Sequence, residues 1–424
     1  MMKTPEELRK DFWLEDEHRG GVIRKQYEEI KRVIHDNDFS WCLSQYEKIR
    51  QHAIDTVPYY KNTKLNTFPV LNKMDILDCY DRHRAKGNYD LPIHVSSTSG
   101  STGTPFAVEQ NYTKRQRNIA DLQVFGELCD YPPRERMVFF RVINSKLHRT
   151  PEQEEKENIF YVDSSDLSQS HLQEMIDIVI EKKPRIIFSY ASTLVELGRF
   201  ALNKGIDVNS FTMRTVLTGG EGISEQNRLM LQKAFGCPVY RRYSDMELGI
   251  LGQDMGDGGQ YILNWGSYYF ECLKIHSDEP TEDGEAGRIV ITDLFNYAFP
   301  MIRYDTGDLG IMARGNNKLP VLREIYGRSR DCVYTTDGRL ISPAKVSVMM
   351  WGSEGVKQWQ FIQETEKDYV MKINANGKVD ENGLRMKFQG LLGIDAQIMI
   401  TYVDEIPVVS SNKRRAVICN LKRK

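Results

Sequence analysis

Apolar residues in the first 55 positions recur every three or four residues, between long charged side chains. Ile23, Tyr27, Ile30 and Ile34 form one such series. This spacing places apolar side chains on one face of a helix. The sequence therefore predicts a helical lead-in over residues 1–55.

Between residues 90 and 240, short apolar runs alternate with amphipathic segments. Strand-like runs occur at 137–143, 185–189 and 214–218, and helices are expected near 169–182, 192–203 and 224–235. This alternation indicates right-handed crossovers and a mostly parallel sheet flanked by helices. Ligands bind such sheets outside the carboxyl ends of the strands, and the Gly-rich and acidic segments of this chain fall there.

Beyond residue 255 the apolar runs shorten, and Gly, Asp and Tyr become more frequent. Runs at 268–275, 288–292 and 309–312 predict an antiparallel strand region attached to the same domain. Residues 327–424 combine strand-like runs with a helix expected near 380–392. The predicted fold class is therefore α/β, with a large N-terminal domain (1–326) and a small mobile α+β C-terminal domain (327–424).

The composition agrees with a two-domain globular protein. The 424 residues are 40% hydrophobic and 27% charged, with a formal net charge of −2, which argues against a dedicated nucleic-acid binder. The apolar runs are strand-length, and the first residues are charged rather than apolar, so we expect a cytoplasmic protein without a membrane partner. The seven cysteines lack a Cys-x-x-Cys pair and suggest neither a disulfide framework nor a zinc knuckle.

The strongest local signal is a run of ten Ser, Thr, Gly and Pro residues at 96–105, between two strand-like segments. Successive backbone N–H groups and hydroxyls of such a loop can bind a polyanion, and glycines let the backbone approach closely. The run lacks the Gly-Lys-Ser/Thr ending of a Walker A loop. Taken alone, it fits a flexible linker equally well.

The run resembles the phosphate-binding loop of the adenylate-forming superfamily, which includes the acyl-CoA synthetases. Residues 57–60 (Val-Pro-Tyr-Tyr) and 68–75 (Phe-Pro-Val-Leu-Asn-Lys-Met-Asp) resemble a segment of the phenylacetate–CoA ligase branch and its relatives in capsule biosynthesis clusters. The resemblance implies that part of the loop binds the nucleotide, with Thr98 also taking part in catalysis. These loop residues are Ser97, Thr98, Ser99, Gly100, Ser101, Thr102 and Gly103.

Further motifs follow in the order of the family. Leu-Thr-Gly-Gly-Glu at 217–221 is similar to the turn that packs on adenine, and Tyr-Ser-Asp-Met-Glu at 243–247 is similar to the Tyr-Gly-x-Thr-Glu motif. The resemblance implies that Glu247 is a Mg²⁺ ligand. A single carboxylate is chemically reasonable, because a hard cation that bridges phosphates needs only one or two protein carboxylates. An exposed acid at a helix start is the plainer interpretation. The nucleotide contacts implied in these motifs are Gly219, Gly220, Glu221, Tyr243, Ser244 and Asp245.

Three motifs in the last third of the chain continue the resemblance. In the family pattern at 303–308, Asp308 accepts hydrogen bonds from both ribose hydroxyls. At 327–331 the pattern has Arg328 reach the ribose, with Arg330 and Asp331 as the hinge of the mobile domain. At 406–415 it places Lys413 in the catalytic lysine position, where an ammonium can stabilise charge that builds at the α-phosphate. A solvated basic tail is the alternative for the last segment.

Some positions depart from the family pattern. Phe106 stands where many members carry Lys or Arg, Met246 replaces a hydroxyl residue, and Asn412 replaces the Gly before the lysine. Only Cys272 lies between the Glu247 and Asp308 motifs, where some relatives carry a cysteine cluster, so no structural zinc is expected.

The resemblance implies that a carboxylate attacks the α-phosphorus of MgATP, giving acyl-AMP and pyrophosphate, before the acyl group passes to coenzyme A. Transfer to an amine, as in capsule biosynthesis, and a nucleotide-binding module without catalysis remain alternatives. Tyr190, Gly219 and Tyr243 are candidates for a pocket that takes an aromatic acid, although aromatic residues at strand ends are more often core. The expected partners are thus a small carboxylate, ATP, Mg²⁺ and CoA or an amine, for a monomer or homodimer.

Overall fold

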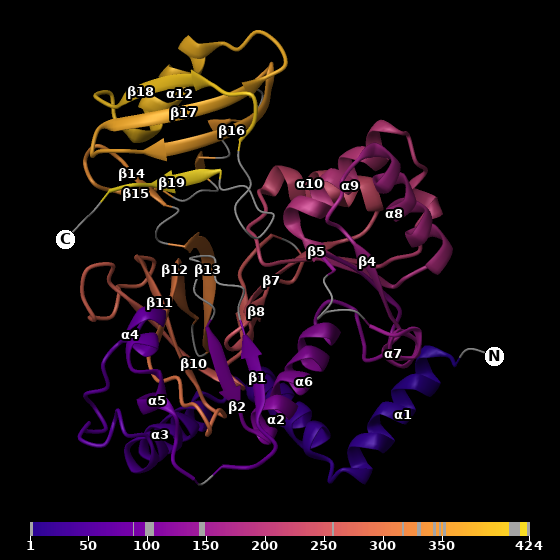
Figure 1. Cartoon of the computed structure of the whole chain (residues 1–424), viewed down its shortest axis with the longest axis vertical. Coiled ribbons are helices and arrows are strands. Elements are labelled where there is room, and N and C mark those ends of the chain that lie inside the picture. The colour runs from indigo at the N-terminus through magenta and orange to yellow at the C-terminus, as the bar shows by residue number, and fades with distance from the viewer. Residues whose placement is uncertain are drawn as a thin grey trace. The chain divides into compact units, whose positions relative to one another are not determined.

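The computed structural model describes residues 3–87, 89–97, 106–143, 149–256, 258–315, 318–328, 332–341, 345–346, 349–350, 353–406 and 416–421. The chain divides into two compact units (Figure 1). The large unit contains most residues up to Glu324, and the small unit consists mainly of Ile325–Lys424. Across the described residues, no helix has both the length and the apolar character needed to cross a membrane.

Three helices open the chain: α1 (Pro5–His18), α2 (Val22–Asp36) and α3 (Phe39–Thr56). Thr4 and Glu7 form a capping box at the start of α1, which satisfies N–H groups that the first turn leaves without partners. The apolar face of α2 packs against α6 (Tyr112–Glu127) in one buried cluster that includes Ile30 and Val124. This packing attaches the opening helices to the rest of the large unit.

A seven-stranded sheet forms the centre of the large unit. Its spatial order is β4 (Ile159–Asp163), β3 (Met137–Arg141), β5 (Ile186–Tyr190), β6 (Thr215–Gly219), β7 (Val239–Asp245), β8 (Gly249–Gln253) and β9 (Ile262–Leu263). The strands from β4 to β7 are parallel, and β8 and β9 continue the sheet antiparallel. The predicted parallel sheet is therefore present, with an antiparallel extension.

The two faces of this sheet have different cover. Val138, Ile187 and Val216 belong to a cluster shared with α8 (Gln169–Lys182), α9 (Ala191–Asn203) and α10 (Glu225–Phe235), and Figure 1 shows these helices together beside the strands. Ile186 and Leu217 are buried on the other face with Cys129. Central strands buried on both faces read as continuous apolar runs. We call the second face the open face, because α8–α10 do not cover it.

The remaining elements of the large unit are short or antiparallel. They are α4 (Lys73–Asp78), α5 (Tyr80–His83), α7 (Pro151–Glu157), the 3₁₀ turn Val208–Ser210, and a hairpin of β1 (His94–Ser97) and β2 (Ala107–Gln110). A four-stranded sheet has the order β10 (Tyr268–Leu273), β11 (Ala286–Asp293), β12 (Tyr304–Gly315) and β13 (Lys318–Arg328). It corresponds to the strand region predicted beyond residue 255.

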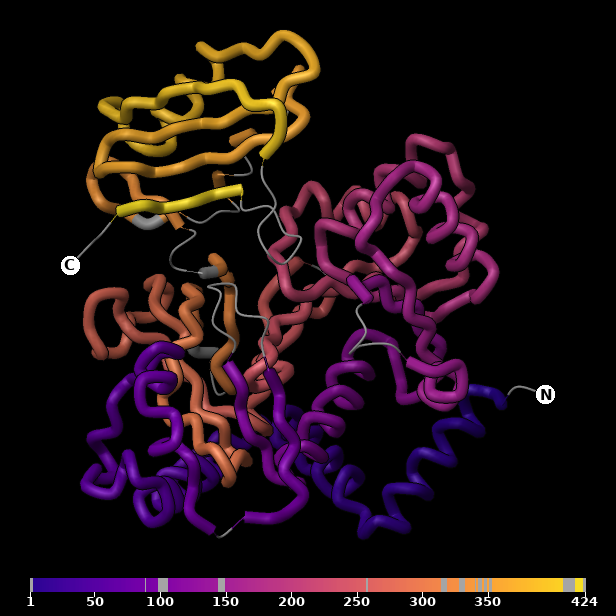
Figure 2. The backbone as a smooth tube through the Cα atoms, viewed as in Figure 1, coloured from indigo at the N-terminus to yellow at the C-terminus, as the bar shows by residue number. Residues whose placement is uncertain are grey.

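The small unit is an α+β structure with its own core. Its main sheet has the order β18 (Gln397–Tyr402), β17 (Asp368–Ala375), β16 (Val356–Gln363) and β19 (Val417–Cys419), beside the short pair β14 (Val333–Tyr334) and β15 (Leu340–Ile341). Helix α12 (Glu381–Leu392) buries Phe388 against Phe361, with ring centroids 4.6 Å apart. Figure 2 traces the backbone of this unit from orange to yellow.

Buried His83 in α5 makes the stability of the large unit depend on pH. It is 1% exposed and lies against Tyr59, with ring centroids 4.1 Å apart. Burial, aided by Arg82, lowers the pKa of His83 from 6.5 to about 4. The unfolded chain therefore binds a proton at higher pH than the folded chain does, so stability is full above pH 6.5 and falls as the pH drops towards 4.

We predict that His83→Asn flattens this pH dependence. Between pH 6.5 and 4 the wild type should lose up to about 3 kcal/mol of unfolding free energy through this histidine alone. Urea unfolding of both proteins across this range measures the difference. Equal slopes for variant and wild type would show that His83 does not carry the effect.

Candidate functional site

The hairpin of β1 and β2 connects two of the predicted motifs. Ser97 pairs with Ala107, so the hairpin strands flank the Ser/Thr/Gly loop. The Ser96 hydroxyl donates to the Met246 carbonyl over 2.7 Å, and the Gln110 amide lies 3.5 Å from the Glu247 carbonyl. Segments 150 positions apart in sequence thus meet at the base of the loop. The loop candidates Thr98 to Gly103 lie outside the described residues.

Glu247 lies in a tight turn between β7 and β8. The Asp245 carboxylate accepts a hydrogen bond of 2.7 Å from the Leu248 N–H, and Asp245 pairs with Gly249. Gly249 has a φ of +125°, and a Cβ at this position would lie 3.0 Å from the Tyr268 hydroxyl, so only glycine fits the turn. Glu247 is 8% exposed, and an exposed position at a helix start is therefore the wrong interpretation of this acid.

A buried polar chain supports the same turn. The Tyr268 hydroxyl donates to the Leu248 carbonyl over 2.6 Å and accepts from the Lys114 ammonium over 3.0 Å. Lys114 also pairs with Asp293 at 2.7 Å, and both side chains are buried. Burial raises the pKa of the Tyr268 phenol well above its ordinary value, so this residue remains a donor. Sequence reasoning missed Lys114 and Tyr268, because no local pattern marks a buried charged residue.

Other predicted residues gather at the carboxyl ends of β5 and β6. Tyr190 pairs with Gly219, and Gly219 pairs with Arg242 of β7. Tyr190 is 39% exposed. Since side chains alternate along a strand, Tyr243 falls on the opposite face of β7 from Arg242. The structure brings Tyr190 and Gly219 together, and it buries Tyr243 to 8% exposure.

The turn after β6 is fixed by a helix cap. Gly220 has a φ of +69°, which favours glycine. The Glu221 carboxylate accepts a hydrogen bond of 2.9 Å from the Ser192 N–H at the start of α9. A negative charge is favourable at a helix N-terminus. Glu221 therefore holds the Gly219–Gly220 turn against the first turn of α9.

The 68–75 and 303–308 motifs also meet. The Leu71 N–H donates to the Arg303 carbonyl over 3.1 Å, and the Asp305 N–H donates to the Leu71 carbonyl over 2.9 Å. Arg303 further binds the Phe68 carbonyl at 2.9 Å and pairs with Glu271 at 3.0 Å. These contacts fix the start of β12, the strand that contains Asp308.

The remaining predicted site residues lie at the end of a described segment or outside the described residues. Arg328 is the last residue of β13, and only its backbone is described. Arg330, Asp331 and Lys413 lie outside the described residues. Phe106, at the position where many family members carry a cation, is fully buried, and its ring lies 5.9 Å from the Lys73 ammonium.

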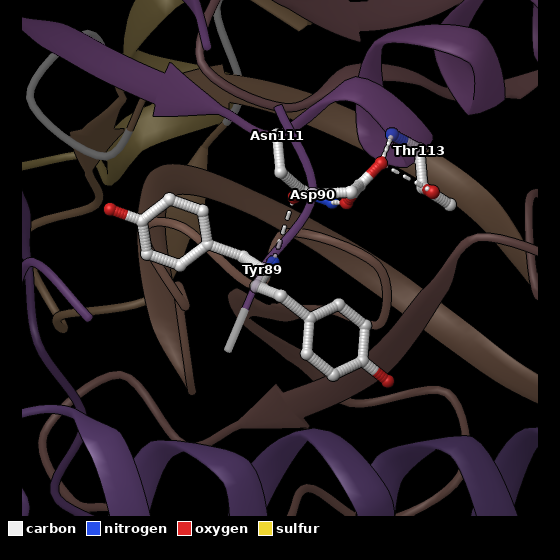
Figure 3. A pocket seen from close by; sticks show the side chains of 5 residues that line it. Tyr89, Asp90, Asn111 and Thr113 are labelled. Atoms are coloured by element: carbon white, nitrogen blue, oxygen red, sulfur yellow. Dashed lines mark hydrogen bonds between the residues drawn. The ribbon is translucent and has the colours of Figure 1, made fainter. Parts of the chain in front are cut away.

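A hollow of ≈ 520 Å³ is lined by five residues that belong to none of these motifs: Tyr89, Asp90, Asn111, Thr113 and Tyr297. Figure 3 shows the Asp90 carboxylate joined to Thr113 by hydrogen bonds. One Asp90 oxygen accepts from the Thr113 N–H and hydroxyl, and the other accepts from the Asn111 amide. Because both oxygens are engaged, the hollow presents no carboxylate ready for a ligand.

The described residues include no group of three or more His, Cys, Asp or Glu that could hold a metal. A cation that bridges phosphates does not need such a group, because one or two carboxylates suffice and phosphate oxygens and water complete the shell. The hard carboxylate oxygens of Glu247, in a turn fixed by Asp245 and Tyr268, fit this kind of Mg²⁺ site.

Comparison with known proteins gives consistent likenesses. A family model described as the CapK C-terminal domain matches residues 333–420. Protein CapK of Staphylococcus aureus is 24% identical over 95% of this chain and 96% of its own length. The phenylacetate-coenzyme A ligase of Escherichia coli (strain K12) is 21% identical over 84% of this chain and 89% of its own length.

A solved structure has the same fold. The 2-hydroxyisobutyryl-CoA ligase, in the postadenylation state with its acyl-AMP, aligns over 89% of both chains with a TM-score of 0.68 and 16% identity. This likeness agrees with the predicted fold class. The chain is thus similar to CapK and to phenylacetate-coenzyme A ligases over most of its length and has the fold of the 2-hydroxyisobutyryl-CoA ligase.

Proposed function

We propose that this protein is an AMP-forming carboxylate ligase. It uses ATP and Mg²⁺ to convert a carboxylic acid into an acyl-adenylate with release of pyrophosphate, and it then transfers the acyl group to coenzyme A. The observation that carries the proposal is the contact between the hairpin and the Glu247 turn, made by Ser96 and Met246 at 2.7 Å. This contact joins a loop suited to phosphates to a carboxylate suited to their cation.

The comparisons support each half of this reaction. Several relatives are phenylacetate-coenzyme A ligases, and the 2-hydroxyisobutyryl-CoA ligase was solved with its acyl-AMP and CoA. Both the acid that is activated and the acceptor of its acyl group are part of what we propose for this chain. Transfer to an amine is the second candidate, favoured by the likeness to CapK over 95% of the chain.

Each part of the site has a defined task in the proposed reaction. The β1–β2 hairpin flanks the loop proposed to bind the phosphates, and Glu247 would hold Mg²⁺, which would supply positive charge to stabilise them. The Asp245–Gly249 turn fixes that carboxylate before substrate arrives, so little reorganisation remains for the reaction itself. Lys413 is proposed to stabilise the charge that develops at the α-phosphate. The chemistry is mainly positioning and electrostatic stabilisation.

The proposal further assigns a moving lid to the small unit. Residues 327–331, with Arg330 and Asp331, are proposed as the hinge between the adenylation and transfer steps. Lids of this kind often limit turnover.

The complete reaction is tested by measuring pyrophosphate, AMP and acyl-CoA for one acid. The three products should form in equal amounts. Formation of AMP and pyrophosphate without thioester, with an amide of the added amine instead, would favour the second candidate.

Loss of the Tyr268 hydroxyl should weaken the Mg²⁺ site. In Tyr268→Phe the Leu248 carbonyl loses its donor and Lys114 loses an acceptor. We expect a loss of about 1–3 kcal/mol of unfolding free energy and a higher Mg²⁺ concentration for half-maximal ATP–pyrophosphate exchange. Tyr46→Phe, at a buried tyrosine that stacks on Tyr269, is the matched control. An unchanged Mg²⁺ requirement in the folded Tyr268 variant would contradict the supporting role.

A further inference from the structure

Two arginines flank a pair of stacked rings on the open face of the seven-stranded sheet. The rings of Phe139 and Phe188 stack with centroids 4.6 Å apart and planes inclined by 26°. The guanidinium carbon of Arg141 lies 5.2 Å from the Phe139 ring centre, and that of Arg242 lies 5.8 Å from the Phe188 ring centre. We call Arg141, Phe139, Phe188 and Arg242 the arginine–phenylalanine strip.

The strip lies near the carboxyl edge of the parallel strands. Arg141 is the last residue of β3, and Arg242 pairs with Gly219, the last residue of β6. A Cβ on Gly219 would lie 3.0 Å from the Phe188 ring, so the absence of a side chain there makes room for this ring beside Arg242. Ligands of open α/β sheets bind at this edge.

The described contacts of Arg242 are all with neutral groups. Its guanidinium donates to the Gln253 amide oxygen at 3.0 and 2.8 Å and to the Phe125 carbonyl at 3.4 Å. By contrast, the adjacent Arg241 pairs with Asp254 at 2.6 Å. Burial lowers the pKa of Arg242, because the charged form loses hydration.

Arg141 shares this charge imbalance. Its neighbour across the strands is Asp163, but that carboxylate accepts from the Ile143 N–H at 3.0 Å and from Ser165. Over the part of the chain that the structure describes, neither Arg141 nor Arg242 forms an ion pair. Partly buried cations without an anionic partner are costly. An anionic ligand supplies the missing charge, and the Nη1 group of Arg242, which takes no part in its described hydrogen bonds, is the donor left for a carboxylate.

We propose that Arg242, with Arg141 adding positive charge, binds a second carboxylate of the acid substrate. The substrate is then a dicarboxylic acid, whose first carboxylate is adenylated and whose carbon skeleton packs on the two phenylalanine rings. This inference rests on the proposed function and narrows its substrate class. It adds a second carboxylate to the substrate, whereas Tyr190, Gly219 and Tyr243 are candidates from the sequence for a pocket that takes an aromatic acid.

Matched pairs of acids test the inference in the wild-type protein. Each pair consists of a dicarboxylate and its monomethyl ester, over a series of aliphatic and aromatic skeletons, in ATP–pyrophosphate exchange. Loss of a charge-assisted hydrogen bond typically costs 1.5–3 kcal/mol. We therefore expect kcat/KM to be roughly 10- to 100-fold higher for the dicarboxylate of the best pair. Equal or higher rates with the esters overturn the inference and leave the proposed function standing.

Variants separate recognition from a structural role. Arg242→Met should raise KM for the dicarboxylate and remove most of the selectivity, while kcat/KM for the ester changes little. Arg199→Met, at an exposed arginine of α9 paired with Glu196, is the matched control and should keep the selectivity. If Arg242 only holds Gln253 and Phe125, its replacement lowers the thermal midpoint and leaves the selectivity ratio unchanged, which overturns the inference.

Arg242→Lys covers the case in which the methionine variant does not fold. Lysine keeps the positive charge but loses the guanidinium geometry, so an intermediate selectivity is expected, and full wild-type selectivity contradicts recognition by the guanidinium donors. Failure of the proposed function has a different signature. Absence of exchange with both members of every pair, in folded protein that binds ATP, overturns the ligase proposal and the inference with it.

Discussion

Replacement of Glu247 by glutamine should lower Mg²⁺-dependent ATP–pyrophosphate exchange by roughly 100- to 1000-fold, a typical effect of losing one preorganised electrostatic contact in an active site. Glutamine keeps the shape of the side chain and removes its charge. The turn should survive, because hydrogen bonds made by Asp245 and Tyr268 hold it on either side of residue 247. The thermal midpoint is therefore expected to stay close to that of the wild type.

The control for this variant is Glu196→Gln, an exposed glutamate of α9 paired with Arg199 at 2.9 Å. It also removes one negative charge from the large unit and should leave exchange unchanged. Titration with Mg²⁺ distinguishes the two variants, because only the Glu247 variant should need more metal. Wild-type exchange and an unchanged Mg²⁺ requirement in Glu247→Gln would exclude this residue as the proposed metal ligand.

Lys413→Ala should strongly reduce adenylate formation and leave the fold intact. The family resemblance gives this lysine contact with the carboxylate and the α-phosphate, where it stabilises charge that appears only in the transition state. We expect kcat for exchange to fall by roughly 100-fold or more, with a smaller change in ATP affinity. Rapid-quench detection of acyl-AMP and direct measurement of ATP binding separate the two effects.

The same variant tests the alternative in which the protein binds nucleotide without catalysis. A binding module would show no exchange in the wild type, and Lys413→Ala would then remove nothing. The matched control is Lys204→Ala, a lysine directly after α9 that no motif includes. Equal loss of exchange in both lysine variants would indicate a general effect of charge rather than a role for Lys413.

The fold was predictable where the buried residues of an element are apolar. β5 and β6 are buried on both faces and appear in the sequence as continuous apolar runs. Helix α6 escaped prediction, because its buried side includes Lys114, Arg117 and Asp121. These charges are compensated by residues far away in sequence, such as Glu29, which pairs with Arg117 at 2.5 Å. No local hydrophobic period reveals a helix whose inner face is charged.

The sequence was enough to predict the motifs of the candidate site but not the residues that position them. Each motif is a local pattern, so Glu247, Gly219 and the Ser/Thr/Gly run could be found one at a time. The partners that position them are not local: Tyr268 supports the Glu247 turn from β10, and Ser96 reaches it from β1. Arg242 was missed for a related reason. An arginine in a strand looks ordinary until Asp254 is seen to pair with Arg241 and not with Arg242.

Carboxylate-dependent ATP–pyrophosphate exchange would detect adenylation itself. It is run on the wild-type protein over a panel of dicarboxylic, aromatic, aliphatic, amino and sugar acids, with and without Mg²⁺. We expect exchange that needs both Mg²⁺ and one class of acid, and that falls by roughly 100-fold or more in Glu247→Gln and Lys413→Ala. Tight ATP binding by the folded wild type without exchange for any acid would contradict the proposed ligase activity.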